Sequence, residues 1–135
     1  MAQDESTFTS EESREFADQL TMCAGYYGWL EEAAQALGRP AAADHIRGYR
    51  NGAKSAALYL EALAFRLDNP DAPARTYGSF SPLVDGPIES SKIRIRALQE
   101  AGNEEQIARM DQECEDLKEA TGGIITLIRE EMAGT

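Results

Sequence analysis

Histidine and cysteine, which most often build metal and nucleophilic centres, are scarce in this sequence. Its 135 residues include one histidine, His45, and two cysteines. A lone histidine beside Asp44 near the start of a helix is more often a surface residue than a catalyst. Bundles that hold two iron ions place Glu-x-x-His pairs inward, and the sequence contains no such pair. We therefore expect no metal site and no cofactor.

Motifs of the common enzyme and cofactor classes are also missing. The sequence has no Cys-x-x-Cys-His for haem attachment, no glycine-rich phosphate loop and no Gly-x-Ser-x-Gly elbow. Cys23 and Cys114 lie on apolar stripes, whereas a nucleophilic thiol needs an exposed site and a basic neighbour. Because no nucleophile–base or acid–base pair can be assembled, we predict that the protein is not an enzyme.

Long apolar runs and basic residues are both in short supply. No apolar run approaches the roughly 20 residues that span a bilayer, so we expect no membrane insertion. The sequence contains 13 basic and 24 acidic residues, which gives a net charge of −11. That charge repels phosphate backbones, so we expect no nucleic-acid binding. It suits either a well-solvated surface or a basic protein partner.

Helical periodicity is what the sequence does contain. Apolar residues recur at alternating steps of four and three along four segments, which is the spacing of one helix face. The first helix is expected at 10–37, after Thr9 and Glu12, whose spacing matches a capping box. The second is expected to begin at Pro40, a favourable first-turn residue, and to end before Pro70.

The second half of the chain should hold two more helices. A Pro-rich loop at 68–82 comes first, longer than most connections in compact domains. The third helix is shorter and runs from Val84 or Pro87 to Ala101. The fourth covers 103–132 and begins with a second capping-box pattern.

These four helices predict one architecture. Gly122-Gly123 should weaken or kink the fourth helix. Strict alternation of four and three is typical of near-parallel packing in bundles. We predict an all-α, up-down-up-down four-helix bundle with a shorter third helix and the long Pro-rich loop between helices 2 and 3. It forms a single domain at 9–135 after a disordered tail at 1–8.

The two cysteines should meet in this topology. The first and fourth helices are antiparallel in an up-down bundle, which places Cys23 and Cys114 at nearly equal height on the two apolar seams. A disulfide there would close a loop of about 90 residues and add roughly 4 kcal/mol of stability. The alternative is two buried free thiols that behave as small apolar residues.

The expected disulfide bears on location. Disulfides persist in oxidising compartments, which favours a periplasmic or secreted protein of bacterial type. Residues 1–7 lack the basic and apolar regions of a signal peptide. Either Met1 replaces a removed signal, or the protein is cytoplasmic.

Two regions are candidate binding sites. Gly25 and Gly28 of the first helix fall level with Gly52 and Gly48 of the second, close to Tyr49. The glycines either let the helices pack tightly or form a slot for a flat ligand between helices 1 and 2.

The second candidate is the loop end of the bundle. Tyr77, Phe80 or Leu83 of the Pro-rich loop should cover the end that the short third helix leaves open, and Gly122 and Gly123 lie there too. Functional residues collect on loops held by a rigid scaffold, so this end is the first place where a ligand or partner site would be expected. The alternative is a loop that only plugs the core.

Charged residues offer a third candidate site. Acidic residues cluster on outer faces at Glu31-Glu32, at Glu104-Glu105, at Glu113, Glu115 and Asp116, and at Glu130-Glu131. Such faces are usually solvated. The alternative is a docking surface for a basic partner, for which Glu113, Glu115 and Asp116 are the candidate residues. Arg47, Arg50 and Lys54 follow one side of the second helix, and we interpret them as salt-bridge partners of neighbouring acids rather than as an anion-binding stripe.

Three functions fit these observations. The first is a non-enzymatic exported protein that binds a protein partner, as inhibitors and immunity proteins do. The second is a small-ligand binding bundle, which requires a cavity on the order of a few hundred Å³. The third is a cytosolic acidic protein that mimics nucleic-acid charge to counter a defence system. A monomer and a homodimer both remain open.

Overall fold

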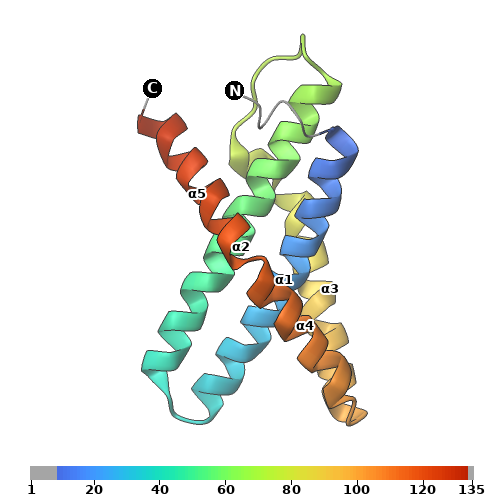
Figure 1. Ribbon diagram of the computed structural model, residues 1–135, viewed down its shortest axis with the longest axis vertical. Helices are drawn as coiled ribbons and strands as arrows, with labels where there is room; N and C mark the ends of the chain where they lie inside the picture. The colour runs from blue at the N-terminus through green and yellow to red at the C-terminus, as the bar shows by residue number, and fades with distance from the viewer. Residues whose placement is uncertain (1–8, 134–135) are drawn as a thin grey trace.

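Residues 9–133 are described by a computed structural model, which is helical throughout apart from its connections (Figure 1). The described elements are α1 (Ser10–Ala36), α2 (Pro40–Asp68), the short 3-10 helix η2 (Tyr77–Phe80), α3 (Ser81–Glu100), α4 (Glu104–Asp116) and α5 (Lys118–Ala133). The predicted all-α bundle is confirmed. The predicted tail at 1–8 lies outside the described residues.

The hairpin of α1 and α2 is the centre of the fold, and its ends are those expected from the sequence. The Thr9 hydroxyl accepts a hydrogen bond from the Glu12 N–H at 3.0 Å, and the Glu12 carboxylate accepts one from the Thr9 N–H at 2.9 Å. Gly38 closes the turn with a φ of 71°, which favours glycine. Pro40 then starts α2. The two helices run antiparallel in Figure 1.

The third helix begins earlier than expected. After an irregular stretch at 69–76, η2 leads directly into α3 at Ser81, so the loop is shorter than the predicted 68–82. Pro82 lies in the first turn of α3, where its missing N–H costs no hydrogen bond. With 20 residues, α3 is still shorter than α1, with 27, and α2, with 29.

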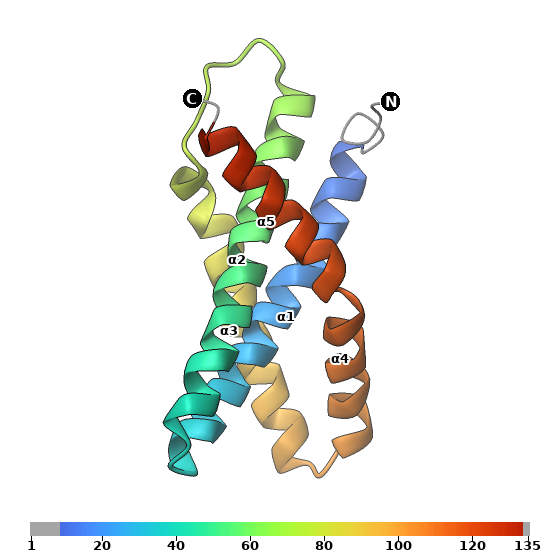
Figure 2. The same ribbon diagram turned by 60° about the vertical axis from the view of Figure 1, so that its left-hand side comes forward.

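The predicted fourth helix is two helices, and the expected position of its break was wrong. The chain leaves α4 at Leu117, whereas Gly122-Gly123 lies inside α5. The reason is tertiary, because Cys114 ties α4 to α1 while Ile124 packs into the core shared by α1 and α2. Figure 2 shows the result, with α5 turning away from α4 and crossing α2.

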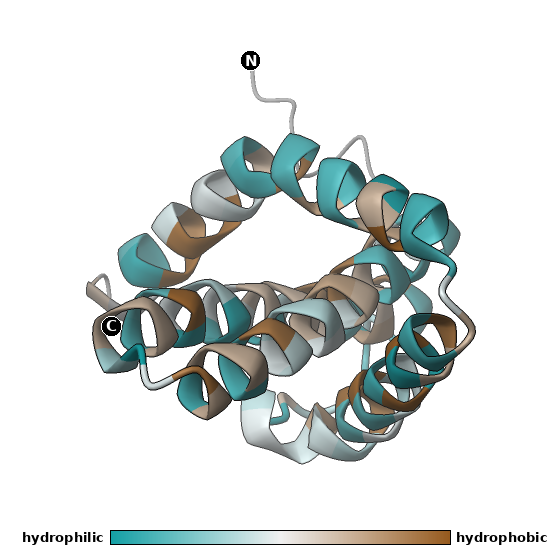
Figure 3. Cartoon of the chain, turned by 90° about the horizontal axis from the view of Figure 1, so that it is seen from below, coloured by the Kyte–Doolittle hydropathy of each residue, from teal (hydrophilic) through white to brown (hydrophobic). Residues whose placement is uncertain are grey.

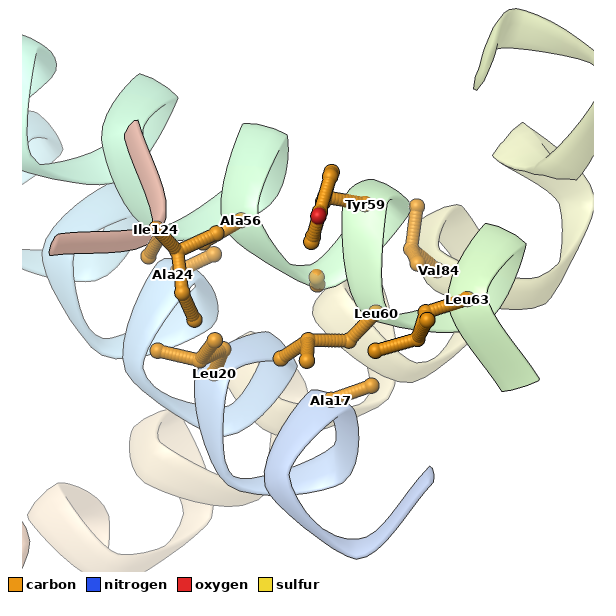
Figure 4. Packing of buried hydrophobic residues seen from close by; sticks show 11 residues of the cluster. Ala17, Leu20, Ala24, Ala56, Tyr59, Leu60, Leu63, Val84 and Ile124 are labelled. Atoms are coloured by element: carbon orange, nitrogen blue, oxygen red, sulfur yellow. The ribbon is translucent and has the colours of Figure 1, made fainter. Parts of the chain in front are cut away.

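The core divides into two clusters along the bundle. The first lies between α1, α2, α3 and α5, and Figure 4 shows Leu20, Leu60 and Val84 converging there. Five of its members are alanines, which let α1 and α2 approach closely: Ala17, Ala24, Ala53, Ala56 and Ala57. The second surrounds the cysteines and consists of Cys23, Tyr26, Tyr27, Ile95, Met110 and Cys114. In Figure 3 much of the hydrophilic colour lies on the outer rims of the helices.

Candidate functional site

The disulfide between Cys23 and Cys114 lines the candidate site. Its Cα atoms lie 5.5 Å apart, and both residues are 2% exposed. The predicted pairing is therefore confirmed. The bond joins the middle of α1 to α4 three residues before the chain breaks at Leu117. It thus fixes the point from which α5 departs.

A pocket of about 190 Å³ opens beside this disulfide. We call it the α2–α5 pocket, because α2 and the start of α5 supply most of its walls. Its lining residues are Leu20, Cys23, Tyr27, Gly48, Tyr49, Gly52, Ala53, Cys114, Leu117, Lys118, Thr121 and Gly122. Most of these groups are apolar or aromatic. Such a lining with a few polar groups is the usual make-up of a small-molecule site.

The four glycines of the predicted slot do not face one another. A Cβ on Gly25 would lie 2.6 Å from Cβ of Ser91 in α3, so this glycine permits close packing of α1 on α3. Gly48 and Gly52 instead line the α2–α5 pocket, and a Cβ at either position would meet no atom within 4 Å. The four glycines therefore do not line one slot between helices 1 and 2, because equal height along two helices does not fix which way each residue points. Gly48, Tyr49 and Gly52 of the prediction line the α2–α5 pocket with residues of α1.

Two tyrosines and a lysine supply the polar character of the pocket. The Tyr27 and Tyr49 rings are 5.5 Å apart at an angle of 32°. The Lys118 ammonium lies 4.0 Å from the centre of the Tyr49 ring, a cation–π contact. The Tyr27 hydroxyl is buried, and no hydrogen-bond partner for it occurs within residues 9–133. Burial raises the pKa of Tyr27, and the charge of Lys118 opposes that rise.

The structure separates the residues of the predicted loop site. Tyr77 and Phe80 belong to η2, where Phe80 is 2% exposed and packs against Phe65. Gly122 lines the α2–α5 pocket instead. Gly123 lies beside it in α5. Leu83 does not cover the core, because it is 54% exposed on α3.

Tyr77 joins η2 to the end of α5 through a shared carboxylate. Its hydroxyl donates to Glu131 at 2.7 Å, and the Tyr59 hydroxyl donates to the same carboxylate at 3.1 Å. Burial, followed by this hydrogen bond, raises the pKa of Tyr77 to about 12. The Tyr77 hydroxyl therefore remains a donor at neutral pH, and it holds α5 against the loop end of the bundle.

The predicted acidic face is present on the surface of α4. Glu113, Glu115 and Asp116 are all exposed. Lys118 pairs with Glu115 at 3.0 Å, and Gln112 donates to Asp116 at 2.9 Å. Glu113 forms no ion pair in the described part of the chain, so part of this negative charge is not neutralised.

One acid expected at the surface is buried instead. Glu31 is 5% exposed, and it accepts hydrogen bonds from Arg50 and from Arg47, the latter at 2.7 Å. Lys54 pairs with Asp85 at 3.1 Å. The interpretation of these three basic residues as salt-bridge partners is confirmed, whereas the solvated placement of Glu31 was wrong. A buried carboxylate needs such partners, because desolvation otherwise penalises its charge.

Sequence reasoning missed several residues of the α2–α5 pocket. Leu117 and Thr121 share an apolar seam with the buried Cys114, which is the pattern of core residues and gives no sign of a pocket. No sequence pattern marks Lys118 as a pocket residue, because its position depends on the break between α4 and α5 at Leu117.

Arg75, in the segment before η2 and outside this pocket, is also not marked by any sequence pattern. It stacks on two phenylalanine rings, which come from α2 and η2.

Other site types find no support in the described residues. Between residues 9 and 133 no group of three or more His, Cys, Asp or Glu side chains could hold a metal ion. None of the helices there has the length and apolar character needed to cross a membrane. Comparison of the chain with family models, curated proteins and solved structures finds no significant match.

Proposed function

We propose that this chain is a non-enzymatic binding protein that holds a small, flat, apolar ligand in the α2–α5 pocket. The observation that carries the proposal is the α2–α5 pocket, whose wall has glycine rather than a side chain at Gly48 and Gly52. Glycine inside a helix costs roughly 0.5–1 kcal/mol relative to alanine. Close packing accounts for that cost at Gly25 but not at these two positions, where the space instead enlarges a pocket.

The dimensions and chemistry of the pocket suggest the class of ligand. An apolar cavity of roughly 150 Å³ holds benzene, so 190 Å³ has room for one or two fused rings. The aromatic walls from Tyr27 and Tyr49 favour a flat ring. An unpaired buried hydroxyl costs about 1–3 kcal/mol. A ring that carries a hydrogen-bond acceptor would recover part of that cost at Tyr27.

The same proposal includes export to an oxidising compartment. The Cys23–Cys114 disulfide supports it, since such bonds are rare in reducing cytosol. Both cysteines line the pocket, so the bond that supports export also shapes the site. An apolar and aromatic pocket in a protein of the periplasm or exterior suits a carrier or sensor of small molecules.

The first test compares two ligands of one shape. Quinoline and naphthalene differ by one ring nitrogen, and we expect both to bind, with quinoline the tighter by roughly tenfold. Binding is measured by ligand-observed NMR and by the rise in melting temperature. In Tyr27→Phe the advantage of quinoline should disappear, because the hydroxyl donor is gone.

Matched glycine variants test the position of the site. Gly52→Leu fills the pocket and should abolish binding of both rings. Gly123→Leu places the same side chain in open space outside the pocket, so affinity should stay unchanged. If neither ring binds the unmodified protein, or if both leucine variants bind equally well, the proposed function is wrong.

A second function is supported by the acidic face of α4. Glu113, Glu115 and Asp116 are exposed on a helix that the disulfide holds against α1, so they form a fixed negative surface for a basic protein partner. We infer that the chain would bind such a partner through this charged surface, in the manner of an inhibitor or immunity protein.

Charge reversal tests that second function. Replacing Glu113, Glu115 and Asp116 together with lysine should weaken capture of a basic partner by roughly tenfold or more and reduce the salt dependence of binding. The matched control reverses Glu104 and Glu105, at the opposite end of α4. If the triple variant and the control variant bind the basic partner equally well, this face is not the binding surface.

A further inference from the structure

A second pocket, of about 210 Å³, lies at the C-terminal end of α2. We call it the loop pocket, because residues of the irregular segment 69–76 form one side of it. The other walls come from α2 and η2. Its lining residues are Ala62, Phe65, Arg66, Asn69, Pro70, Ala72, Pro73, Ala74, Arg75, Tyr77 and Phe80. None of them belongs to the α2–α5 pocket.

Arg75 is held in a fixed orientation at this pocket. Its guanidinium carbon lies 4.2 Å from the centre of the Phe80 ring and 5.0 Å from that of Phe65. Its Nε donates to Ser79 Oγ at 3.1 Å, and its Nη2 donates to the Ser79 carbonyl at 3.1 Å. The Ser79 hydroxyl is itself fixed, since it donates to the Thr76 carbonyl at 2.7 Å.

These contacts leave one edge of the guanidinium unused. Arginine carries five N–H donors in a rigid fork. Ser79 occupies the edge formed by Nε and Nη2 of Arg75. The edge formed by Nη1 and the second proton of Nη2 makes no hydrogen bond within residues 9–133. Two parallel donors of this kind match the two oxygens of a carboxylate.

Two arginines without an ion pair in the described chain line the loop pocket. Among the thirteen basic residues, all within 9–133, eight form ion pairs with acids of the described chain. Arg75 and Arg66, which both line the loop pocket, form none there. Glu131 accepts hydrogen bonds from Tyr77 and Tyr59 instead. In a chain with net charge −11, two unpaired guanidinium groups at one pocket point to an anionic ligand.

We propose that the loop pocket binds a small organic monocarboxylate with an apolar body. Its carboxylate would bridge the free edge of Arg75, with Arg66 as a second cation. Its apolar body would lie against Phe65 and the prolines of the loop, which inorganic anions cannot exploit. This site is separate from the α2–α5 pocket, and neither proposal depends on the other.

The test uses benzoate with benzamide, its neutral counterpart of nearly the same shape. In ¹H–¹⁵N NMR titrations, benzoate should shift the Arg75 side-chain Nε–H and the amides of 69–80. Benzamide should bind at least roughly tenfold more weakly, because it lacks the charge that pairs with arginine. Arg75→Lys keeps the charge but loses the fork, and Arg66→Gln removes the second cation. Each should lower benzoate affinity several-fold.

Arg94→Gln supplies the matched control. Arg94 is exposed on α3, forms no ion pair within the described residues and lies outside the loop pocket. Its replacement should leave benzoate affinity unchanged. Equal affinity for benzoate and benzamide would overturn the proposal. The proposal would also be overturned if benzoate shifted only resonances outside 62–80, or if Arg94→Gln and Arg66→Gln lowered benzoate affinity equally. Binding of inorganic phosphate as tight as that of benzoate would overturn it too.

Discussion

Replacing Cys23 and Cys114 together with alanine is expected to lower the free energy of unfolding by roughly 4 kcal/mol. The two residues are 91 positions apart, so the disulfide greatly restricts the unfolded chain. Since domains are typically stable by about 5–15 kcal/mol, this is a large fraction of the total. Urea denaturation under oxidising conditions, followed by circular dichroism, measures the change.

Reductant provides the control for this prediction. It should destabilise the unmodified protein by about as much as the double substitution, and it should leave the alanine variant unchanged. Intact mass after alkylation in denaturant should find no reactive thiol until reductant is added. A loss of stability below about 1 kcal/mol would contradict the proposed contribution of the bond.

The expected dependence on the disulfide also bears on the proposed location. Without the bond, α4 would keep its contacts through Met110 and the ring of Tyr26, whose hydroxyl donates to Asp111 at 2.6 Å. Those contacts hold only one face of a short helix. In a reducing compartment the α2–α5 pocket would lose the covalent link between two of its walls, so the ligand site and the oxidising environment belong to one proposal.

Local and one-dimensional features could be predicted from the sequence. The capping box at Thr9 depends on residues three apart, and the start of α2 depends on one proline. Pairing of Cys23 with Cys114 required the heights of two antiparallel helices and the apolar seams on which both cysteines lie. The first two inferences need only neighbouring residues, and the heights follow from a rise of about 1.5 Å per residue along a helix.

Features that depend on the rotation of a helix about its axis could not be predicted. Gly25 and Gly52 were expected at the same height, yet one faces α3 and the other lines the pocket. Glu31 is off the apolar seam, yet it is buried where two arginines of α2 meet it. The break at Leu117 likewise follows from two tertiary attachments rather than from the glycines nearby.

The same substitution at Gly25 and at Gly52 is expected to change stability in opposite directions. A Cβ at Gly25 would lie 2.7 Å from the backbone oxygen of Ile88 and 2.6 Å from Ser91 Cβ. Ser91 cannot easily retreat, because its hydroxyl donates to the Met22 carbonyl at 3.0 Å. Overpacking of this kind costs about 1–3 kcal/mol, so Gly25→Ala should lower the free energy of unfolding.

Gly52→Ala should raise the free energy of unfolding by about 0.5–1 kcal/mol, because the methyl enters open space and restricts the unfolded chain. Gly123→Ala, which also has open space but lies outside the pocket, should give a similar gain. Urea denaturation of the three variants measures these changes. Stabilisation by Gly25→Ala, or destabilisation by Gly52→Ala, would contradict the packing described here. Gly52→Ala is also expected to weaken quinoline binding, whereas Gly123→Ala should raise stability alone. That result would mean that Gly52 lowers the stability of the protein but keeps space in the pocket for a ligand.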